Sequence, residues 1–383
     1  ANTPHGFYSL YDNLKSVGRL YVLKGGAGCG KSTLSKLAFP EYKYVSLEDP
    51  DNRAFATEDP RAFISTYPGR TIIDEVQRVP QLLSYLQTYA DQSGKEGMYI
   101  LTGSQNFQLL EAVSQSLAGR VGIVTLLPFS YEEMRNGGID CGNADMQMFR
   151  GCYPRLFDKD IPSGTYYADY INTYVERDVR IVKNITNLAT FTKFIKLCAG
   201  RIGQILNMAS LATECGVSIP TINSWLSLLQ TSYIVFLLQP DSRNFSKRLV
   251  KTPKLYFHDT GLACSLLEIR QPEQLSTHYL RGGIFENMVI VEMLKRRYNR
   301  GVKPSATFWR DSNGNEVDLL INDDEGTKAV EIKSGETYNA DYFKGLRHWG
   351  GLSGEPVENM TVIYGGETPK TTSYGNLVPW RTL

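Results

Sequence analysis

The stretch YVLKGGAGCGKSTL, from Tyr21 to Leu34, joins an apolar run to a glycine-rich turn and then to a helix-like segment. Its centre, GGAGCGKS from Gly25 to Ser32, fits the phosphate-loop pattern G-x-x-x-x-G-K-S/T. In this pattern the glycines let successive backbone N–H groups point at one anion, and the following helix adds its positive end. An ordinary glycine turn would not need both flanking elements. The stretch therefore predicts a nucleotide-binding α/β domain.

Side chains of this loop have separate expected roles. Lys31 would reach the β- and γ-phosphates of a nucleotide, and the hydroxyl of Ser32 would be a ligand of Mg²⁺. Cys29 stands at a tolerant position of the pattern, so we expect it to fill space rather than act as a redox thiol. The expected nucleotide-binding residues of the loop are Gly25, Gly28, Gly30, Lys31, Ser32 and Thr33.

A second, acidic element follows in GRTIIDEVQRVP. There an apolar strand, residues 71–73, ends in Asp74 and Glu75, and ligands of open α/β sheets bind at the carboxyl ends of strands. We expect Asp74 to hold Mg²⁺ through water and Glu75 to polarise the attacking water. The Asp-Glu pair favours hydrolysis over transfer of a phosphoryl group to a small molecule.

Other strand-like segments complete a sheet. MYILTGSQNF ends in a polar run in which Ser104 would sense the γ-phosphate, although turn-forming residues are also common at strand ends. Together with YKYVSLED and VGIVTLLPF, the apolar segments alternate with helical stretches such as PQLLSYLQTYADQ. This alternation predicts a parallel, doubly wound α/β sheet.

Composition limits the class of protein. With 383 residues, 42% of them apolar, the chain has enough material for about two to three domains. Its 41 Lys and Arg nearly equal its 40 Asp and Glu, so any basic surface must be local. Six scattered cysteines argue against zinc and disulfides, and no apolar run approaches the roughly 18 residues of a membrane helix. We therefore expect a soluble, cytoplasmic protein with no membrane partner.

The order of several motifs resembles one family. After the phosphate loop and the acidic strand come LTGS, SLAGRVGIVTLLPFSYEE, YVERDVR and KLYFHDTGLA. This order resembles the bacterial and archaeal ATPases of the AAA superfamily, in which the ATPase is followed by a winged helix and by a C-terminal domain like the PD-(D/E)XK nucleases. The resemblance covers nearly the whole chain and implies ATP as the ligand.

The resemblance also implies an arginine that stabilises the γ-phosphate. Arg120 in LAGR and Arg177 in YVERDV match the family's pattern. A structural ion pair is an equally good explanation of either residue. An arginine supplied by a neighbouring subunit would require a homo-oligomer.

Four segments are predicted along the chain. The expected order is an AAA-type P-loop ATPase core, a helical connector, a winged helix, and an α/β domain of the restriction-endonuclease type. Their predicted bounds are residues 1–135, 136–188, 189–254 and 255–383.

The predicted winged helix contains the sequence of a helix-turn-helix with a turn at Gly216. Its second helix, Ile219 to Gln230, has no Arg or Lys, so direct readout of bases is not expected. The segment that follows, residues 243–254, would form a basic wing that contacts phosphates of DNA or RNA. A solvated loop and an interdomain ion-pairing surface are the alternatives. The basic residues are Arg243, Lys247, Arg248, Lys251 and Lys254.

The last segment contains a helix with Glu286 and two strands with the pairs Glu316/Asp318 and Glu331/Lys333. Side chains two apart share a face of a strand, and a β-hairpin would bring Asp318 beside the second pair. We expect Glu286, Asp318 and Glu331 to bind Mg²⁺ or Mn²⁺, and Lys333 to stabilise the pentacovalent phosphate or orient a water. The arrangement resembles the PD-(D/E)XK nucleases. Exposed ion pairs, or a domain kept only for binding, are the alternatives.

Three functions are consistent with these patterns. The favoured one is an ATP-hydrolysing enzyme whose nucleotide state moves a winged helix and a metal-dependent nuclease domain on DNA. The second is a nucleotide-switched regulatory protein in which the nuclease-like domain only binds. The third is an interaction protein with ATP as a structural ligand.

Overall fold

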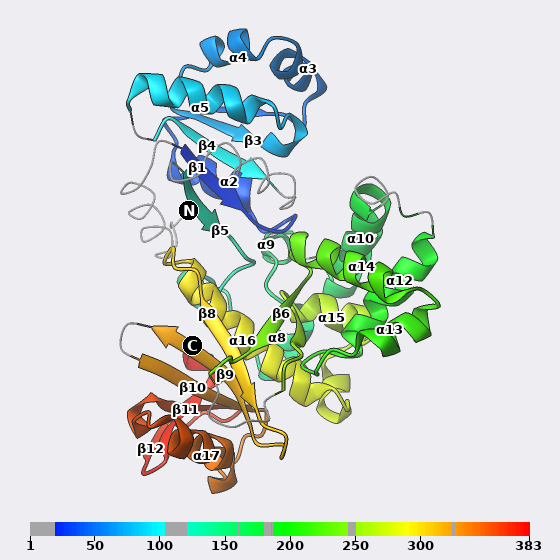
Figure 1. Ribbon diagram of the computed structural model, residues 1–383, viewed down its shortest axis with the longest axis vertical. Coiled ribbons are helices and arrows are strands. Elements are labelled where there is room, and N and C mark those ends of the chain that lie inside the picture. Colours follow the sequence, from blue (N-terminus) through cyan, green and yellow to red (C-terminus); the bar gives the residue numbers. More distant parts are fainter. Residues whose placement is uncertain are drawn as a thin grey trace. The chain divides into compact units, whose positions relative to one another are not determined.

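The computed structural model describes residues 20–95, 97–103, 121–159, 161–179, 185, 187–243, 250–323 and 326–383. The chain divides into two compact units (Figure 1). Unit 1 consists of Ala1–Gly137 with two short returning segments, Thr231–Tyr233 and Lys295–Val302. Unit 2 consists of Gly138–Gln230, Ile234–Leu294 and Lys303–Leu383.

Unit 1 is built on a five-stranded parallel sheet in the order β2-β3-β4-β1-β5. The chain runs from the interior strand β1 to the edge strand β2 and returns through β3 and β4. The carboxyl ends of β1, β4 and β3 therefore lie along one edge of the sheet. The predicted parallel α/β sheet is confirmed. The strands are β1 (Leu20–Lys24), β2 (Lys43–Ser46), β3 (Thr71–Asp74), β4 (Tyr99–Gly103) and β5 (Val121–Thr125).

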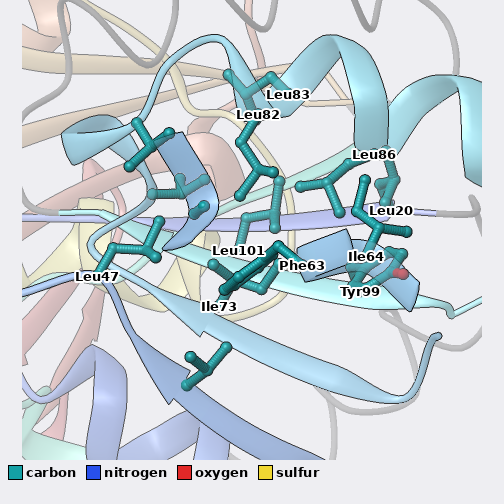
Figure 2. Close-up of a cluster of buried hydrophobic side chains, with 14 of the residues drawn as sticks. Leu20, Leu47, Phe63, Ile64, Ile73, Leu82, Leu83, Leu86, Tyr99 and Leu101 are labelled. Carbon is teal, nitrogen blue, oxygen red and sulfur yellow. The ribbon is translucent and has the colours of Figure 1, made fainter. Parts of the chain in front are cut away.

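Helices cover both faces of this sheet. On one face, Phe63 and Leu86 pack against Ile73 and Leu101 of the central strands (Figure 2). The opposite face carries the alternate residues of the same strands and packs against α2. Burial on both faces explains why the strands are continuous apolar runs in the sequence. The helices are α2 (Lys31–Ala38), α3 (Pro50–Glu58), α4 (Pro60–Thr66), the 3-10 turn η1 (Val76–Arg78), α5 (Leu82–Ser93) and α7 (Tyr131–Asn136).

The first part of unit 2 is helical. Between its helices, the ring centroid of Trp225 lies 5.2 Å from that of Phe191 and 5.3 Å from that of Phe194. Gly216, with φ of 68°, ends α13 in the left-handed conformation and α14 follows. The helices are α8 (Ala144–Arg150), α9 (Pro154–Asp158), α10 (Ser163–Thr173), the π-helical η2 (Tyr174–Val179), α12 (Leu188–Ala199), α13 (Met208–Cys215), α14 (Ile219–Thr231) and α15 (Thr260–Leu266).

The second part of unit 2 is a mixed sheet in the order β12-β13-β11-β10-β9-β8-β6-β7. Leu346 and Trp349 of α17 pack on it. The strands are β6 (Val235–Pro240), β7 (Lys254–Phe257), β8 (Ser305–Arg310), β9 (Glu316–Asp323), β10 (Gly326–Lys333), β11 (Met360–Tyr364), β12 (Lys370–Thr372) and β13 (Gly375–Pro379). The helices are η3 (Pro272–Thr277), α16 (Arg281–Tyr298), η4 (Ala340–Phe343), α17 (Lys344–Ser353), η5 (Val357–Asn359) and η6 (Trp380–Thr382).

One sheet joins segments that the sequence predicted to be separate. Strand β6 pairs in antiparallel fashion with β7 and in parallel with β8, through Gln239 opposite Thr307. The strands on either side of the predicted wing, residues 243–254, thus belong to the C-terminal sheet. The assignment of a winged helix stays a prediction. Among the described residues, none of the helices is long and apolar enough to cross a membrane.

Candidate nucleotide site and C-terminal carboxylate site

The glycines of the loop between β1 and α2 are required by its geometry. Gly28 and Gly30 have φ of 77° and 94°, a left-handed region that favours glycine. At Gly25 an added Cβ would lie 2.1 Å from the carbonyl oxygen of Leu126. Gly30 is also the N-cap of α2, and it has no side chain that could accept hydrogen bonds from the first N–H groups of the helix. The loop is thus shaped to receive an anion at the helix start.

The ammonium group of Lys31 lies inside this loop. It donates hydrogen bonds to the carbonyl oxygens of Gly25 at 2.9 Å and Gly26 at 2.7 Å, and the residue is only 6% exposed. Both acceptors are neutral, so the positive charge of Lys31 is not cancelled by these two contacts. A phosphate oxygen would replace them with a charge-assisted hydrogen bond, which is stronger.

The carboxylate of Asp74, at the end of β3, receives three hydroxyl groups. Ser32 donates to Oδ1 at 2.9 Å, Thr102 of β4 donates to the same oxygen, and Tyr44 of β2 donates to Oδ2 at 2.6 Å. Asp74 itself is 6% exposed. A hydroxyl and a carboxylate are the hard oxygen ligands that Mg²⁺ prefers, so Ser32 and Asp74 fit the ion.

Burial and the charge of Asp74 both raise the pKa of Tyr44 above its ordinary value. The phenol therefore keeps its proton near neutral pH and acts as the donor in this contact.

Glu75 follows Asp74 in a left-handed conformation with φ of 57°. Non-glycine residues rarely adopt this conformation, and such strain is concentrated at functional sites. The amide of Gln77 donates to Glu75 Oε2 at 2.6 Å, which holds the carboxylate next to the strand end. Three other predicted residues have no described side chain: Ser104 and Arg120 lie outside the described residues, as does the side chain of Arg177.

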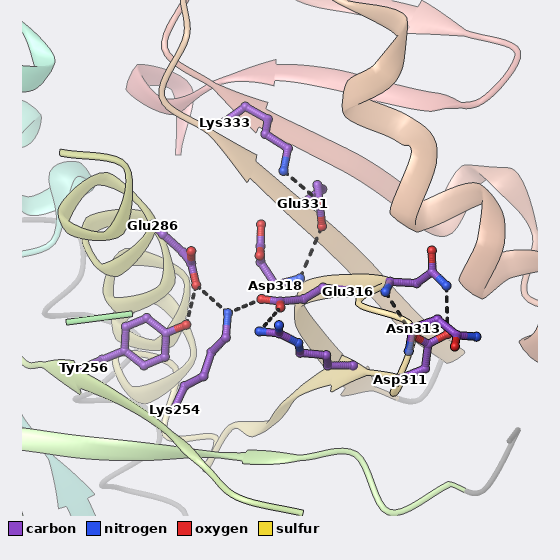
Figure 3. A network of polar contacts seen from close by, with 11 residues as sticks. Lys254, Tyr256, Glu286, Asp311, Asn313, Glu316, Asp318, Glu331 and Lys333 are labelled. Atoms are coloured by element: carbon purple, nitrogen blue, oxygen red, sulfur yellow. Dashed lines mark hydrogen bonds and ion pairs between the residues drawn. The ribbon is translucent and has the colours of Figure 1, made fainter. Parts of the chain in front are cut away.

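A second polar site lies in unit 2, where carboxylates from three elements converge (Figure 3). Oxygens of Glu286 on α16 and of Glu316 and Asp318 on β9 lie within 4.8 Å of one another. Asp318 Oδ2 accepts from the backbone N–H of Ile332 at 2.8 Å. Glu331 on β10 accepts from the backbone N–H of Asp318 at 3.3 Å.

A lysine occupies the middle of this carboxylate site. Lys254, at the start of β7, donates to Glu286 Oε1 at 3.2 Å and also to Glu316, and it is 3% exposed. Tyr256, two residues on and therefore on the same face of β7, donates to Glu286. The oxygen donors suit Mg²⁺ or Mn²⁺. However, the ammonium group of Lys254 already contacts two of the three carboxylates that could hold the metal.

Sequence profiles of known families match three parts of the chain. Residues 17–135 match a profile described as the AAA domain. Residues 141–273 and 281–383 match two profiles described as domains of unknown function, DUF8612 and DUF4143. Residues 17–135, within unit 1, therefore have the sequence pattern of an AAA domain.

Two curated relatives match along most of their length. They are uncharacterised proteins of Mycobacterium bovis and Mycobacterium tuberculosis, each 28% identical over 354 residues, or 90% of this chain and 76% of the relative.

Solved structures with distant similarity include a Walker-type ATPase of Pyrococcus abyssi. It is 14% identical, with a TM-score of 0.45, over 68% of this chain and 94% of that one. RuvB of Thermotoga maritima is 16% identical, with a TM-score of 0.32, over 60% and 87%.

The basic wing predicted from the sequence is wrong for Lys254. Lys254 is buried among carboxylates instead of facing solvent. Arg243 pairs with Asp241 at 2.8 Å and donates to Thr327 Oγ1 at 2.7 Å. Lys251 is exposed, whereas Lys247 and Arg248 lie outside the described residues.

The structure brings the predicted residues of the C-terminal site together but changes their grouping. Lys333 pairs with Glu331 at 2.9 Å, as their spacing of two on one strand suggested. Glu316, rather than Glu331, lies with Glu286 and Asp318 in the group of carboxylates that could share one ion. Glu316 and Asp318 are two residues apart and share a face of β9, whereas Glu331 lies on the neighbouring strand β10, where the register sets Val330 opposite Leu319.

Burial perturbs the titration of this site. It raises the pKa of Glu331 to about 8 and of Glu286 to about 7, and the charge of Asp318 adds to both shifts. Burial raises the pKa of Asp318 as well. Burial opposes the charged form of Lys254, but the neighbouring carboxylates, Glu286 first, raise its pKa above the ordinary value. The ammonium is therefore retained.

Two residues that contact Asp74 and two that contact the carboxylates of unit 2 were not expected at these sites from the sequence. Tyr44 and Thr102 contact Asp74 from neighbouring strands, and no local motif marks them. In unit 2, Lys254 and Tyr256 alternate on β7 in KLYF, a period-2 pattern that would have indicated one shared face.

Proposed function

We propose that this protein hydrolyses ATP with Mg²⁺ in unit 1, and that the nucleotide state controls how unit 2 acts on or binds DNA. The observation that carries the proposal is the hydrogen bond between Ser32 of the phosphate loop and Asp74 of the acidic strand. It joins the two elements that an ATPase needs at one edge of the sheet, next to the buried ammonium of Lys31.

The residues of this site would divide the work as follows. Bound Mg²⁺ would supply positive charge beside the β- and γ-phosphates. Lys31 would exchange the carbonyls of Gly25 and Gly26 for phosphate oxygens, and Ser32 and Asp74 would face the ion. Glu75 would accept a hydrogen bond from the attacking water and orient it in line with the γ-phosphate.

Binding of ATP tests the proposal directly. Calorimetry with Mg²⁺·ATP should give a saturable heat with the wild-type chain and none with Lys31→Ala, because the variant loses the only ammonium inside the described loop. Lys95→Ala is the matched control, since Lys95 is exposed in the same unit. A wild-type chain that gives no heat, or a Lys31→Ala chain that binds normally, would refute the proposed function.

Coupling to nucleic acid needs its own test. The helices α13 and α14, the β6–β7 hairpin and the exposed Lys251 support contact with a phosphate backbone. ATP turnover should rise when double-stranded DNA, single-stranded DNA or RNA is added, and the gain should fall with salt. Turnover that none of the three changes would end this part of the proposal and leave the ATPase untouched.

The assembly and the arginine finger are part of the same proposal. We assign the stabilisation of the γ-phosphate to Arg120 or Arg177, one of them supplied by a second copy of the chain. Turnover per subunit should then rise with protein concentration, and the rise should disappear in the variant that lacks the finger. Equal turnover per subunit at all concentrations would contradict a finger supplied in trans.

A second candidate function is a nucleotide-switched regulatory protein whose C-terminal domain binds but does not cleave. The specific observation that favours it is Lys254. Three cations offset the negative charge of the carboxylates. Lys254 contacts Glu286 and Glu316. Arg310 also pairs with Glu316, and Lys333 pairs with Glu331. Little negative charge then remains to attract a divalent ion.

Incubation with Mn²⁺ or Mg²⁺ and supercoiled, linear or branched DNA separates the two candidates. Cleavage by the wild-type chain that is lost in Asp318→Ala would establish a nuclease. If both the wild-type protein and Asp318→Ala leave the DNA intact while ATP turnover continues, the regulatory alternative is established.

A further inference from the structure

The two oxygens of Asp74 have different neighbours. Oδ1 accepts from Ser32, the residue expected to face Mg²⁺, at 2.9 Å. Oδ2 accepts only from Tyr44 among the described hydrogen bonds, at 2.6 Å. Thr102 donates to Oδ1 as well, so the phenol is the contact that holds the other side of the carboxylate and fixes the orientation of its plane.

The ring of Tyr44 is itself held in place. Its strand, β2, pairs with β3 in the register that sets Tyr44 opposite Ile72 and Ser46 opposite Asp74. The ammonium of Lys36, one turn into α2, lies 3.6 Å from the ring centroid. The ring is thus fixed from the strand on one side and from the helix of the phosphate loop on the other, although 37% of Tyr44 remains exposed.

We propose that Tyr44 is a positioning residue for the magnesium side of the nucleotide site. Its hydroxyl holds Asp74 Oδ2, so that Oδ1 stays directed at Ser32 and at the water or ion beside it. Without the hydroxyl, only the two donors to Oδ1 hold the carboxylate, which can then rotate further about its terminal torsion, since this torsion is broad for aspartate. This inference rests on the proposed binding of Mg²⁺·ATP.

Tyr44→Phe removes the hydroxyl and leaves the ring for Lys36. ATP affinity should be measured by calorimetry in excess Mg²⁺ and again in EDTA. The ratio of ATP affinity in Mg²⁺ to that in EDTA should fall about tenfold. This is the effect expected from the loss of one hydrogen bond to a charged acceptor. Affinity in EDTA should stay at the wild-type value, which also shows that the variant is folded.

Tyr42→Phe is the matched control. Tyr42 lies two residues before Tyr44 and donates its hydroxyl to the carbonyl oxygen of Gly97 at 2.7 Å, away from Asp74. Its Mg²⁺ dependence should match that of the wild-type chain.

Two results would overturn the inference while the proposed function stands. One is an unchanged gain from Mg²⁺ in Tyr44→Phe. The other is an equal loss of affinity with and without Mg²⁺, which would indicate a purely structural role. A wild-type chain that binds no ATP at all would instead refute the proposed function and, with it, this inference.

Discussion

The two polar sites of this chain use the same kinds of residue but neutralise them differently. In unit 1, Asp74 is held by hydroxyl groups of Ser32, Tyr44 and Thr102, all of them neutral. In unit 2, Glu286 and Glu316 share the ammonium of a buried lysine. Neutral donors can give way to a cation without leaving a charge unpaired, whereas a buried ammonium cannot.

Their lysines show the same contrast. Lys31 and Lys254 are both buried, but Lys31 contacts backbone carbonyls and Lys254 contacts carboxylates. The charge of Lys31 is available to an incoming phosphate, while that of Lys254 is already used within the protein. Burial of a lysine therefore does not identify a ligand site; the charge of its partners does.

The largest expected effect is a loss of ATP turnover at the candidate nucleotide site. Glu75→Gln should bind ATP normally but lose about 10²- to 10⁴-fold in turnover, because the amide cannot accept the proton of the attacking water. Binding is measured by calorimetry and turnover by phosphate release. Gln77→Ala removes the donor to Glu75 and should cost less. Full turnover in Glu75→Gln would assign the base elsewhere.

The next largest effect is expected on the stability of unit 2 when Lys254 is replaced. Lys254→Met should lower the free energy of unfolding by about 3–5 kcal/mol, since it leaves two partly buried carboxylates without their partner. Tryptophan fluorescence in urea reports unit 2 alone, because Trp225, Trp309, Trp349 and Trp380 all belong to it.

Lys251→Met is the control for this experiment, because Lys251 is exposed three residues earlier. If Lys254→Met and Lys251→Met unfold at the same urea concentration, the carboxylates do not depend on the ammonium. Partial recovery of Lys254→Met by Mn²⁺ would show that a divalent ion can take its place.

A smaller effect is expected on the pH dependence of the stability of unit 2. Folding raises the pKa of Glu331 from 4.5 to about 8. Between these two pH values the folded chain therefore binds a proton that the unfolded chain has lost. Its contribution to stability is complete below 4.5 and is lost as the pH rises to about 8. The urea midpoint of unit 2 should therefore fall over this range, and Glu331→Gln should flatten the fall. A midpoint that rises instead would contradict the assigned shift.

The smallest effect is expected for a neutral donor. Thr102→Val removes one of the hydroxyl groups that donate to Asp74. We expect the free energy of unfolding of unit 1 to fall by only about 1.5 kcal/mol, because Ser32 and Tyr44 still donate. Circular dichroism must follow this transition, since residues 1–137 contain no tryptophan. A loss as large as that of Lys254→Met would erase the distinction between neutral and charged partners.

Prediction from sequence succeeded where the chemistry is local. The phosphate loop, the strand before it and the helix after it fall within Leu20–Ala38, and the glycine positions follow from backbone sterics alone. Asp318, Glu331 and Lys333 were also brought together correctly, because β9 and β10 are consecutive strands of one hairpin.

Prediction failed where the partners are distant. Lys254 lies 32 residues from Glu286 and 62 from Glu316 in the sequence, and its charge alone suggested a solvent-facing wing. Tyr44 lies 30 residues from Asp74, on a strand whose place at the sheet edge no local pattern encodes.

The sequence by itself thus determined the parallel sheet of unit 1, its phosphate loop and the hairpin carboxylates, since backbone conformation and strand alternation depend on near neighbours. Only the tertiary structure decided what neutralises each carboxylate. The order of strands in a sheet sets which side chains meet across it, and that order is fixed by packing of the whole unit.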